Sequence, residues 1–275
     1  MLEKQRQRIL ERIQNFRLMD DAFMSKFFEN DLECTSLLLQ IILNNPDIKA
    51  IESVSQSYVK NLQGRSICLD IKATDASGRI FNVEVLRKDN GANPRRARYH
   101  SALIDANLIL PGENLETIPE TYVIFITEHD VINASEPLYY IDRVVKQTGM
   151  DFNDGAHIIY VNGEYRGQNL IGDLMHDFNC RKPSEMKLKT LATRAKYLKE
   201  TEKGVTNMWD AVKDLVDEIV EENKEDWVSQ SKKETQIETA KRLFSIGLTA
   251  EQVSAGTGLS LAEVQELAHN SDSSK

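Results

Sequence analysis

The sequence predicts an α/β fold in which a mixed β-sheet is flanked by helices and followed by an α-helical C-terminal extension. Three observations predict it: two short strands joined by a tight turn, a later strand that is apolar on both faces, and amphipathic helical segments around them. At 275 residues the chain is long enough for one main core and a smaller appendage. We therefore expect a main domain over residues 15–185, an acidic helical segment over 186–236 and a small helical module over 237–270.

The amino-acid composition indicates which classes of protein this chain can belong to. Hydrophobic residues make up 41% of the chain and charged residues 28%, which is typical of a soluble globular protein. No stretch reaches the roughly 18 to 20 apolar residues that span a bilayer, and the N-terminus lacks the apolar core of a signal peptide. We therefore expect a cytoplasmic protein that does not enter a membrane. The formal net charge of −9 argues against a chain that coats nucleic acid unspecifically, so any nucleic-acid site must be local.

The first half of the predicted main domain consists of a helix and three strands of the sheet. Residues 20–45 carry apolar side chains at helical spacing, and this pattern ends before Asn44-Asn45-Pro46. Extended segments follow at Ile51–Tyr58, Ser66–Thr74 and Ile80–Leu86. Residues 75–78 supply a tight turn, so the second and third of these segments are predicted to form a hairpin.

The second half of the sheet is predicted to be reached through a helix. Pro94–Leu110 has a proline in its first turn and a core face formed by Leu103, Ile104 and Leu108. Thr121–Thr127 has almost no polar alternation, which is typical of a strand covered on both faces. Shorter strands are expected at Leu138–Asp142 and His157–Val161. A helical crossover after an antiparallel hairpin predicts a mixed sheet with helices on both sides.

Beyond residue 186 only helices are expected. Between Thr201 and Glu238 eleven acidic residues stand against five basic ones, a local charge of −6. Two capping boxes, Thr249 with Gln252 and Ser260 with Glu263, then predict two short helices in the terminal module. This module resembles a helix-turn-helix, but its second helix contains no lysine or arginine, which argues against contact with phosphates.

The apolar stripe of the acidic helices has two interpretations. The stripe comprises Trp209, Leu215, Val216 and Ile219. It would suit a protein partner or a second copy of the chain, and simple packing on the core accounts for it equally well.

The predicted hairpin carries a pair of acids, Asp70 on its first strand and Glu84 on its second. Adjacent strands can direct two carboxylates to one point, and hard cations such as Mg²⁺ take one or two carboxylates together with water and phosphate oxygens. By itself the pair is weak evidence, because alternating strands often place acids on their solvent faces.

A family resemblance adds to this pattern. The stretches that carry it are Leu69-Asp70-Ile71, Val83-Glu84-Val85, Gly91–Ser101, Pro119–Thr127 and Ile158–Tyr165. They resemble the PD-(D/E)XK nuclease family transposases, bacterial relatives of the recombination-promoting nucleases, over about residues 20–185.

The resemblance implies a restriction-endonuclease-like core that hydrolyses DNA phosphodiesters with Mg²⁺, or with Mn²⁺ or Ca²⁺ in its place. Asp70 and Glu84 would be the metal ligands and catalytic acids, and the backbone carbonyl of Val85 a third metal contact. An endonuclease of this kind would act in mobile elements, DNA recombination or phage defence. Asp21 or Glu33 is a candidate for a further acid from the first helix, although both are also typical surface residues.

Leu86 departs from the family's pattern, which has lysine or glutamine at this catalytic position. Leucine can neither orient a water molecule nor stabilise the charge that develops on phosphorus. Since strand side chains alternate, Leu86 is expected on the face of Glu84. Lys88, which has the same parity, or Arg98 or Tyr99 on the following helix could supply the missing group.

The segment from Arg87 to Arg98 has a local charge of +4 in a chain that is otherwise acidic, and it is the best candidate for phosphate contact. The predicted DNA-binding residues are Lys88, Arg95, Arg96, Arg98 and Tyr99. Arg95 and Arg96 fit a solvated helix face equally well. His100 is a weaker candidate, because it only follows Arg98 and Tyr99.

The remaining chemistry-bearing residues form no recognisable motif. Cys34, Cys68 and Cys180 are widely spaced, without a Cys-x-x-Cys pair or a neighbouring histidine at zinc-ligand spacing, so we interpret them as reduced thiols. The histidines are scattered, without a Ser/His/Asp or Cys/His arrangement. A small-molecule enzyme would need a Gly-rich phosphate loop or a nucleophile motif, and neither is present.

Two functions remain at this stage. The first is a metal-dependent DNA endonuclease. The second is a catalytically impaired member of the same family that binds DNA or a protein partner without cleavage, and Leu86 favours it.

Overall fold

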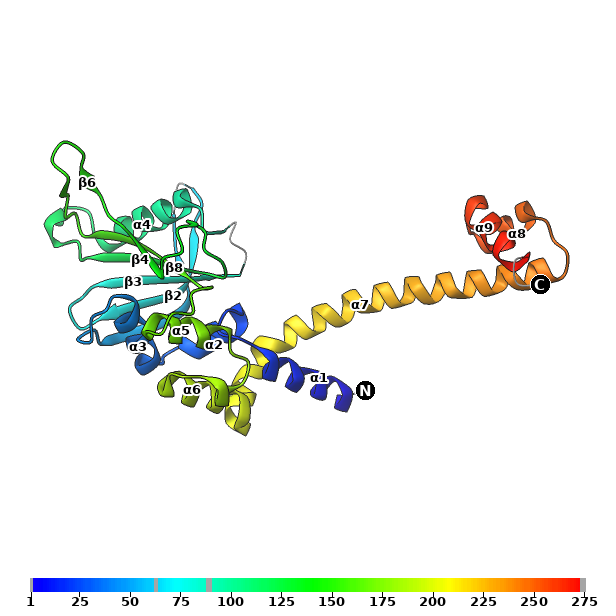
Figure 1. Ribbon diagram of the computed structural model, residues 1–275, viewed down its shortest axis with the longest axis horizontal. Helices are drawn as coiled ribbons and strands as arrows, with labels where there is room; N and C mark the ends of the chain where they lie inside the picture. Colours follow the sequence, from blue (N-terminus) through cyan, green and yellow to red (C-terminus); the bar gives the residue numbers. More distant parts are fainter. Residues whose placement is uncertain (1, 62–63, 88–90, 273–275) are drawn as a thin grey trace. The chain divides into compact units, whose positions relative to one another are not determined.

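The computed structural model describes residues 2–61, 64–87 and 91–272, except for the side chains of 2–5, 210, 214–231, 234 and 268–272. Its main element is a six-stranded mixed sheet with the order β1-β2-β3-β4-β8-β5 (Figure 1). The strands are β1 (Ala50–Val59), β2 (Ile67–Asp75), β3 (Ile80–Leu86), β4 (Thr121–Thr127), β5 (Leu138–Ile141) and β8 (Ala156–Asn162). β1 to β3 are antiparallel, β3, β4 and β8 are parallel, and β5 is antiparallel to β8. The predicted mixed sheet and all six of its strands are confirmed.

Helices cover both faces of this sheet. α4 (Pro94–Leu108) packs on one face, where its Leu103 and Ile104 join Val123 and Phe125 of β4 in a buried cluster. α2 (Asp21–Phe28), α3 (Leu32–Ile42) and α5 (Leu170–Asn179) lie on the other face, with α6 (Lys189–Glu200) beyond them (Figure 1). This arrangement of helices about a mixed sheet is consistent with a restriction-endonuclease-like fold.

The helix expected over residues 20–45 is in fact two helices. α2 ends at Phe28 and α3 begins at Leu32, because Asn30 takes a left-handed φ of 54° and the Asp31 side chain accepts a hydrogen bond from the backbone of Cys34. Both helices keep the predicted apolar face buried. The break turns the chain so that the two helices cover different parts of the sheet.

Some elements were not anticipated by strand and helix patterning. They are the 3₁₀ turns Leu115–Thr117 and Pro183–Glu185, and a ribbon made of β6 (Val144–Val145) and β7 (Met150–Asp151) between β5 and β8. The charged N-terminal segment forms a helix, α1 (Leu2–Asn15), as its helix-like sequence predicts. Only Ile9 and Ile13 bury apolar side chains among the described residues of α1. The ribbon strands are two residues each, too short for a period to show.

The C-terminal part is helical, as predicted. The chain divides into two compact units, Met1–Lys213 and Asp214–Lys275. α7 (Glu202–Ser245) begins in the first unit, and α8 (Ala250–Thr257) and α9 (Leu261–Asp272) complete the second. The capping box of Thr249 and Gln252 is present, and Gly258 ends α8 with a φ of 75°. In the predicted apolar stripe, the side chains of Leu215, Val216 and Ile219 lie outside the described part.

Among the described residues, no helix is long and apolar enough to cross a lipid bilayer.

Candidate active site

Asp70 and Glu84 meet where β2 and β3 part. The ladder between the two strands runs from Thr74 paired with Ile80 to Ile71 paired with Val83. At the next position the backbone N–H of Asp70 lies 3.5 Å from Oε1 of Glu84, and the N–H of Val85 donates to Oδ2 of Asp70 over 3.1 Å. Acidic side chains therefore take the place of ladder hydrogen bonds, and this brings the two predicted carboxylates together.

The two acids are withdrawn from water. Glu84 is 0% exposed. Burial raises the pKa of Asp70 to about 7, and the nearby charge of Glu84 raises it further, against the opposing effects of the Val85 N–H and Arg96. Two close carboxylates with little solvent around them favour either a bound proton or a bound cation.

Asp21 is a third acid at this place. It is the first residue of α2, and much of its surface is exposed. Partial removal of water from its carboxylate nevertheless raises its pKa, and the negative charges of Asp20 and Glu84 raise this pKa further. The positive charge of Arg87 lowers it. Asp21 in turn raises the pKa of Asp70. The other candidate from the first helices, Glu33, is not part of this group, since it accepts a hydrogen bond from Thr190 next to α6.

Helix α4 presents Arg96 and His100 to Glu84. Nη2 of Arg96 lies 2.6 Å from Oε2 of Glu84, and Nδ1 of His100 lies 3.5 Å from Oε1. Arg96 also donates from Nε to Nε2 of His100 over 3.3 Å, and its guanidinium carbon lies 5.9 Å from the centre of the Phe125 ring. Among the described basic residues of the 87–98 segment, Arg96 is thus the one that contacts Glu84.

Asn82 fixes the orientation of His100. Since Nε2 of His100 accepts from Arg96, the ring proton sits on Nδ1, which faces the Asn82 amide group at 3.2 Å. Among the described residues, Oδ1 of Asn82 is the one buried side-chain atom that lacks a hydrogen-bond partner. Rotation of this amide by 180° turns Oδ1 towards Nδ1 of His100, where it can accept the ring proton.

Leu86 lies on the same face of β3 as Glu84, as predicted. It is partly buried and packs against the apolar cluster beneath α4. An added Cβ on Gly91 would lie 3.2 Å from Leu86 and 3.0 Å from the guanidinium of Arg96. Leu86 therefore closes the apolar side of the site, and Arg96 borders the same small space.

Of the other predicted DNA-binding residues, the three that the structure describes contact neither Asp70 nor Glu84. Arg95, Arg98 and Tyr99 line an open hollow of about 850 Å³ together with Arg65, Arg96 and His100. The Tyr99 hydroxyl donates to the backbone carbonyl of Arg65 and accepts from Asn61 over 3.0 Å, so Tyr99 is tied to the loop between β1 and β2. Lys88 lies outside the described residues.

The role of Arg96 could have been inferred from the sequence. Ile104 was placed on the core face of this helix, and steps of four residues lead from Ile104 to His100 and then to Arg96. Arg98 and Tyr99, the other candidates for the missing group, are exposed on α4 and line the hollow beside Arg96, so their role stays a prediction. No comparable pattern marked Asp21.

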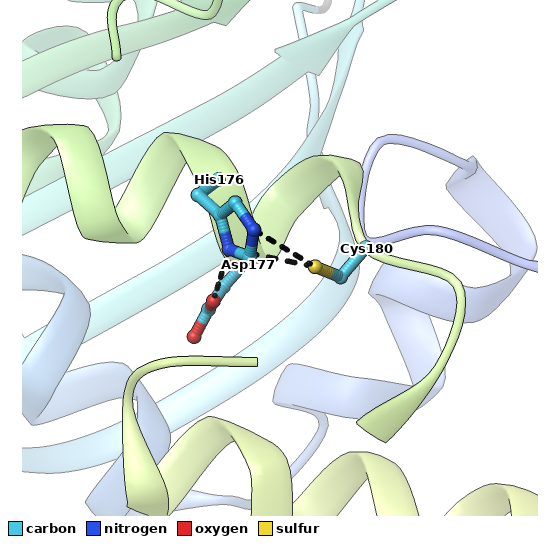
Figure 2. A group of neighbouring side chains, drawn as sticks. All are labelled: His176, Asp177 and Cys180. Atoms are coloured by element: carbon cyan, nitrogen blue, oxygen red, sulfur yellow. Dashed lines mark hydrogen bonds and ion pairs between the residues drawn. The ribbon is translucent and has the colours of Figure 1, made fainter. Parts of the chain in front are cut away.

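A second group of metal-binding residue types lies at the end of α5 (Figure 2). Nδ1 of His176 lies 3.0 Å from Oδ1 of Asp177 and 3.5 Å from Sγ of Cys180. Our expectation that no cysteine has a histidine neighbour was therefore wrong: His176 lies in the last turn of α5, and Cys180, four residues later, is the C-cap of this helix. Asp177, however, is buried, and its two oxygens accept from the backbone of Lys187 and Leu188 over 2.8 Å each. We interpret the group as a clamp on the segment that leads to α6.

Comparison with known proteins assigns a family to the part of the chain that forms the sheet. Residues 22–165, more than half of the chain, match the family described as PD-(D/E)XK nuclease family transposase. This range contains β1 to β5, β8 and α4, together with Asp70 and Glu84. Neither a curated protein nor a solved structure matches the chain significantly. Nucleases of this type generally use divalent metal ions. The chain belongs to the PD-(D/E)XK nuclease family transposases.

Proposed function

We propose that this chain hydrolyses phosphodiester bonds of DNA with a divalent metal ion. The observation that carries the proposal is the pairing of Asp70 and Glu84 at the point where β2 and β3 part, with the pKa of Asp70 raised to about 7. A hard cation relieves the repulsion between two such carboxylates, and oxygen donors of this kind fit Mg²⁺, with Mn²⁺ and Ca²⁺ as substitutes.

Asp70, Glu84 and the backbone carbonyl of Val85 would hold the ion, and Asp21 lies at the rim as an additional donor. When bound, the ion polarises a phosphate oxygen and lowers the pKa of the attacking water. Hydrolysis forms a bond between the water oxygen and phosphorus and breaks one ester bond, and the departing oxygen takes up a proton. The protein's contribution is to fix the two acids at one place, where a bound cation offsets the effects that raise the pKa of Asp70.

Arg96 would supply the positive charge that Leu86 cannot. The family pattern places lysine or glutamine at position 86, whereas here a guanidinium reaches Glu84 from α4. The Arg96 side chain is 36% exposed, so a phosphate that approaches from the adjoining hollow can meet it. A cation fixed beside the reacting phosphate stabilises the charge that develops in the transition state.

A specific observation also favours the second function, DNA or protein binding without cleavage. Leu86 leaves the family's third catalytic position without a polar group, and Arg96 occupies one oxygen of Glu84. In this account the basic residues of α4 bind DNA, and the acidic segment 186–236 offers a surface to a protein partner or a second copy of the chain.

Plasmid cleavage separates the two functions. The purified protein is incubated with Mg²⁺, Mn²⁺, Ca²⁺ or EDTA, beside Asp70→Ala and Glu84→Ala. The proposed nuclease cleaves with Mg²⁺ or Mn²⁺, and both substitutions abolish cleavage while the circular dichroism spectrum is unchanged. Cleavage that persists in both variants would remove these acids from the account.

A further inference from the structure

A second basic hollow has Asp20, the neighbour of Asp21, in its wall, and it shares no lining residue with the hollow beside α4. It measures about 450 Å³ and is lined by five arginines against two acids, Glu11 and Asp20. The arginines come from α1, the segment after it, the end of β3 and the segment after α5: Arg8, Arg12, Arg17, Arg87 and Arg181. In a chain with a net charge of −9, such a local excess of positive charge requires an explanation.

Only some of these arginines are neutralised. Arg17 pairs with Glu128 at 3.0 Å, and Arg87 pairs with Asp20 at 2.8 Å. Among the side chains that the structure describes, Arg8, Arg12 and Arg181 contact no carboxylate, and Arg12 instead lies over the ring of Phe16 at 5.4 Å. These three guanidinium groups are solvent-exposed and free to bind an anion.

A buried lysine joins the walls of this hollow. Lys199 is 2% exposed. Its ammonium group donates to the backbone carbonyls of Gln14 over 3.3 Å and Phe16 over 2.5 Å, and also to that of Arg181. These acceptors are the end of α1, the segment after it and the segment after α5. Lys199 thus fixes the arginines of two distant segments at one place and adds a positive charge beneath them.

Two residues that line this hollow are sequence neighbours of residues at the acidic site. Asp20, in its wall, directly precedes Asp21, and Arg87 directly follows Leu86. The charge of Arg87 also lowers the pKa of Asp21. On the other side, Arg96 connects Glu84 to the hollow that contains Arg65, Arg95 and Arg98. The acids are therefore adjacent to one set of arginines through Asp20 and Arg87, and to the other set through Arg96.

We propose that Arg8, Arg12 and Arg181 bind phosphates of the DNA backbone on one side of the acids, while Arg65, Arg95 and Arg98 bind phosphates on the other. The inference rests on the proposed function for the identity of the polymer. It places the backbone across the end of β3, from one arginine-lined hollow to the other. α1, which lies outside the matched range 22–165, is then part of the substrate surface.

DNA binding tests this proposal. We measure the fluorescence anisotropy of a labelled duplex of about 20 base pairs at several salt concentrations, with Ca²⁺ as the cation. The variant is Arg8→Gln/Arg12→Gln/Arg181→Gln. The matched control is Lys49→Gln/Lys146→Gln/Lys232→Gln, which removes three exposed charges that line neither hollow. Melting curves of both variants establish that they fold.

The arginine variant is expected to bind about tenfold more weakly at moderate salt. The slope of log K against log salt should become shallower by about two to three, since each lost phosphate contact removes about 0.9 from it. The control should change the slope by less than about one. Equal slopes and affinities in the two variants overturn the inference and leave the proposed nuclease intact, because cleavage is measured separately.

Two further outcomes also decide against it. If the unaltered protein binds no duplex, this inference fails, whereas metal-dependent plasmid cleavage remains a separate readout of the proposed function. If the arginine variant loses affinity for polyglutamate and keeps its affinity for DNA, the hollow is a site for an acidic protein.

Discussion

The guanidinium of Arg96 lies 2.6 Å from the carboxylate of Glu84, although the two residues belong to different elements, helix α4 and strand β3. Glu84 is fully buried and Arg96 is partly exposed. A charge-assisted hydrogen bond at this distance compensates the burial of Glu84. At the same time it places a permanent positive charge at the edge of the site, next to the position where the family's pattern has lysine or glutamine and this chain has Leu86.

Substitution of Arg96 should therefore impair cleavage more than substitution of its neighbours. For Arg96→Gln we expect the single-turnover rate to fall by about 10² to 10³, the usual effect of losing one group that stabilises the transition state. Arg95→Gln, which removes an equal charge from the exposed side of the same helix turn, should reduce the rate by less than about tenfold. Equal losses in the two variants would show that Arg96 acts only through overall charge.

A compensating substitution tests the same assignment from the other side. If Arg96 takes the role that position 86 has in the family, Leu86→Lys should restore part of the activity of Arg96→Gln, because it returns a cation to the face of Glu84. The double variant is measured beside Arg96→Gln alone under the same conditions. If the double variant is folded and cleaves DNA no faster than Arg96→Gln alone, the assignment is contradicted.

The raised pKa of Asp70 predicts how metal binding depends on pH. The carboxylate must lose its proton to bind a cation, and that proton is held up to about pH 7. The apparent affinity for Mn²⁺ should rise by up to about tenfold per pH unit below pH 7 and level off above it. Calorimetric titration between pH 5.5 and pH 8.5 measures it. Affinity that is constant across this range would show that Asp70 is not a ligand.

Asp70 also predicts the stability of the metal-free protein. Its pKa is 3.8 when unfolded and about 7 when folded, so between these values the folded state binds more protons and the free energy of unfolding falls as pH rises. Asp70→Asn should therefore raise the melting temperature at pH 8 by several degrees, at about 2 to 4 °C per kcal/mol, and have less effect at pH 4. The exposed control Asp47→Asn should change little at either pH.

Much of the fold follows from sequence periodicity, and the site follows from it only in part. The strands Ile80–Leu86 and Thr121–Thr127 were predicted with their observed limits, because burial on one or both faces leaves a clear pattern. The pairing of Asp70 with Glu84 was also predictable, since a hairpin aligns its two strands. The parting of the strands there was not, because it depends on side-chain hydrogen bonds that periodicity does not encode.

The basic hollow beside α1 shows where sequence reasoning ends. Arg8, Arg17, Arg87 and Arg181 are far apart in the chain and look like separate surface residues. Tertiary packing around the buried Lys199 brings their segments together. The segment Arg87 to Arg98 was recognised because its basic residues lie within twelve positions of the sequence, and it contributes residues to both hollows.

Asp177 is predicted to be the structural member of the group at the end of α5. Asp177→Ala leaves the N–H groups of Lys187 and Leu188 without their acceptor and should cost about 2 kcal/mol or more in urea unfolding of the larger unit. His176→Ala and Cys180→Ala, which remove partly exposed neighbours, should each cost less than about 1 kcal/mol. If all three cost the same and Zn²⁺ raises only the stability of the unaltered protein, the group is a metal site.

Lys199 predicts a gain in stability at alkaline pH. Burial lowers the pKa of Lys199 from 10.5 to about 8. The charge of Arg181 also lowers this pKa, whereas Asp20 and Cys180 raise it. Between pH 8 and pH 10.5 the unfolded chain binds more protons than the folded one, so this residue's contribution to the free energy of unfolding rises with pH. The stability difference between the unaltered protein and Lys199→Met should shift towards lysine from pH 7.5 to pH 9.5. With the exposed control Lys196→Met, the difference should stay constant.

The most direct test of the account is plasmid cleavage by the unaltered protein and by Leu86→Gln, each with Mg²⁺ and with EDTA. If Arg96 supplies the missing charge, the unaltered protein cleaves with Mg²⁺, fails with EDTA, and gains less than about tenfold from glutamine at position 86. Cleavage that appears only in Leu86→Gln would contradict the account and identify this chain as a nuclease silenced at position 86, which acts by binding.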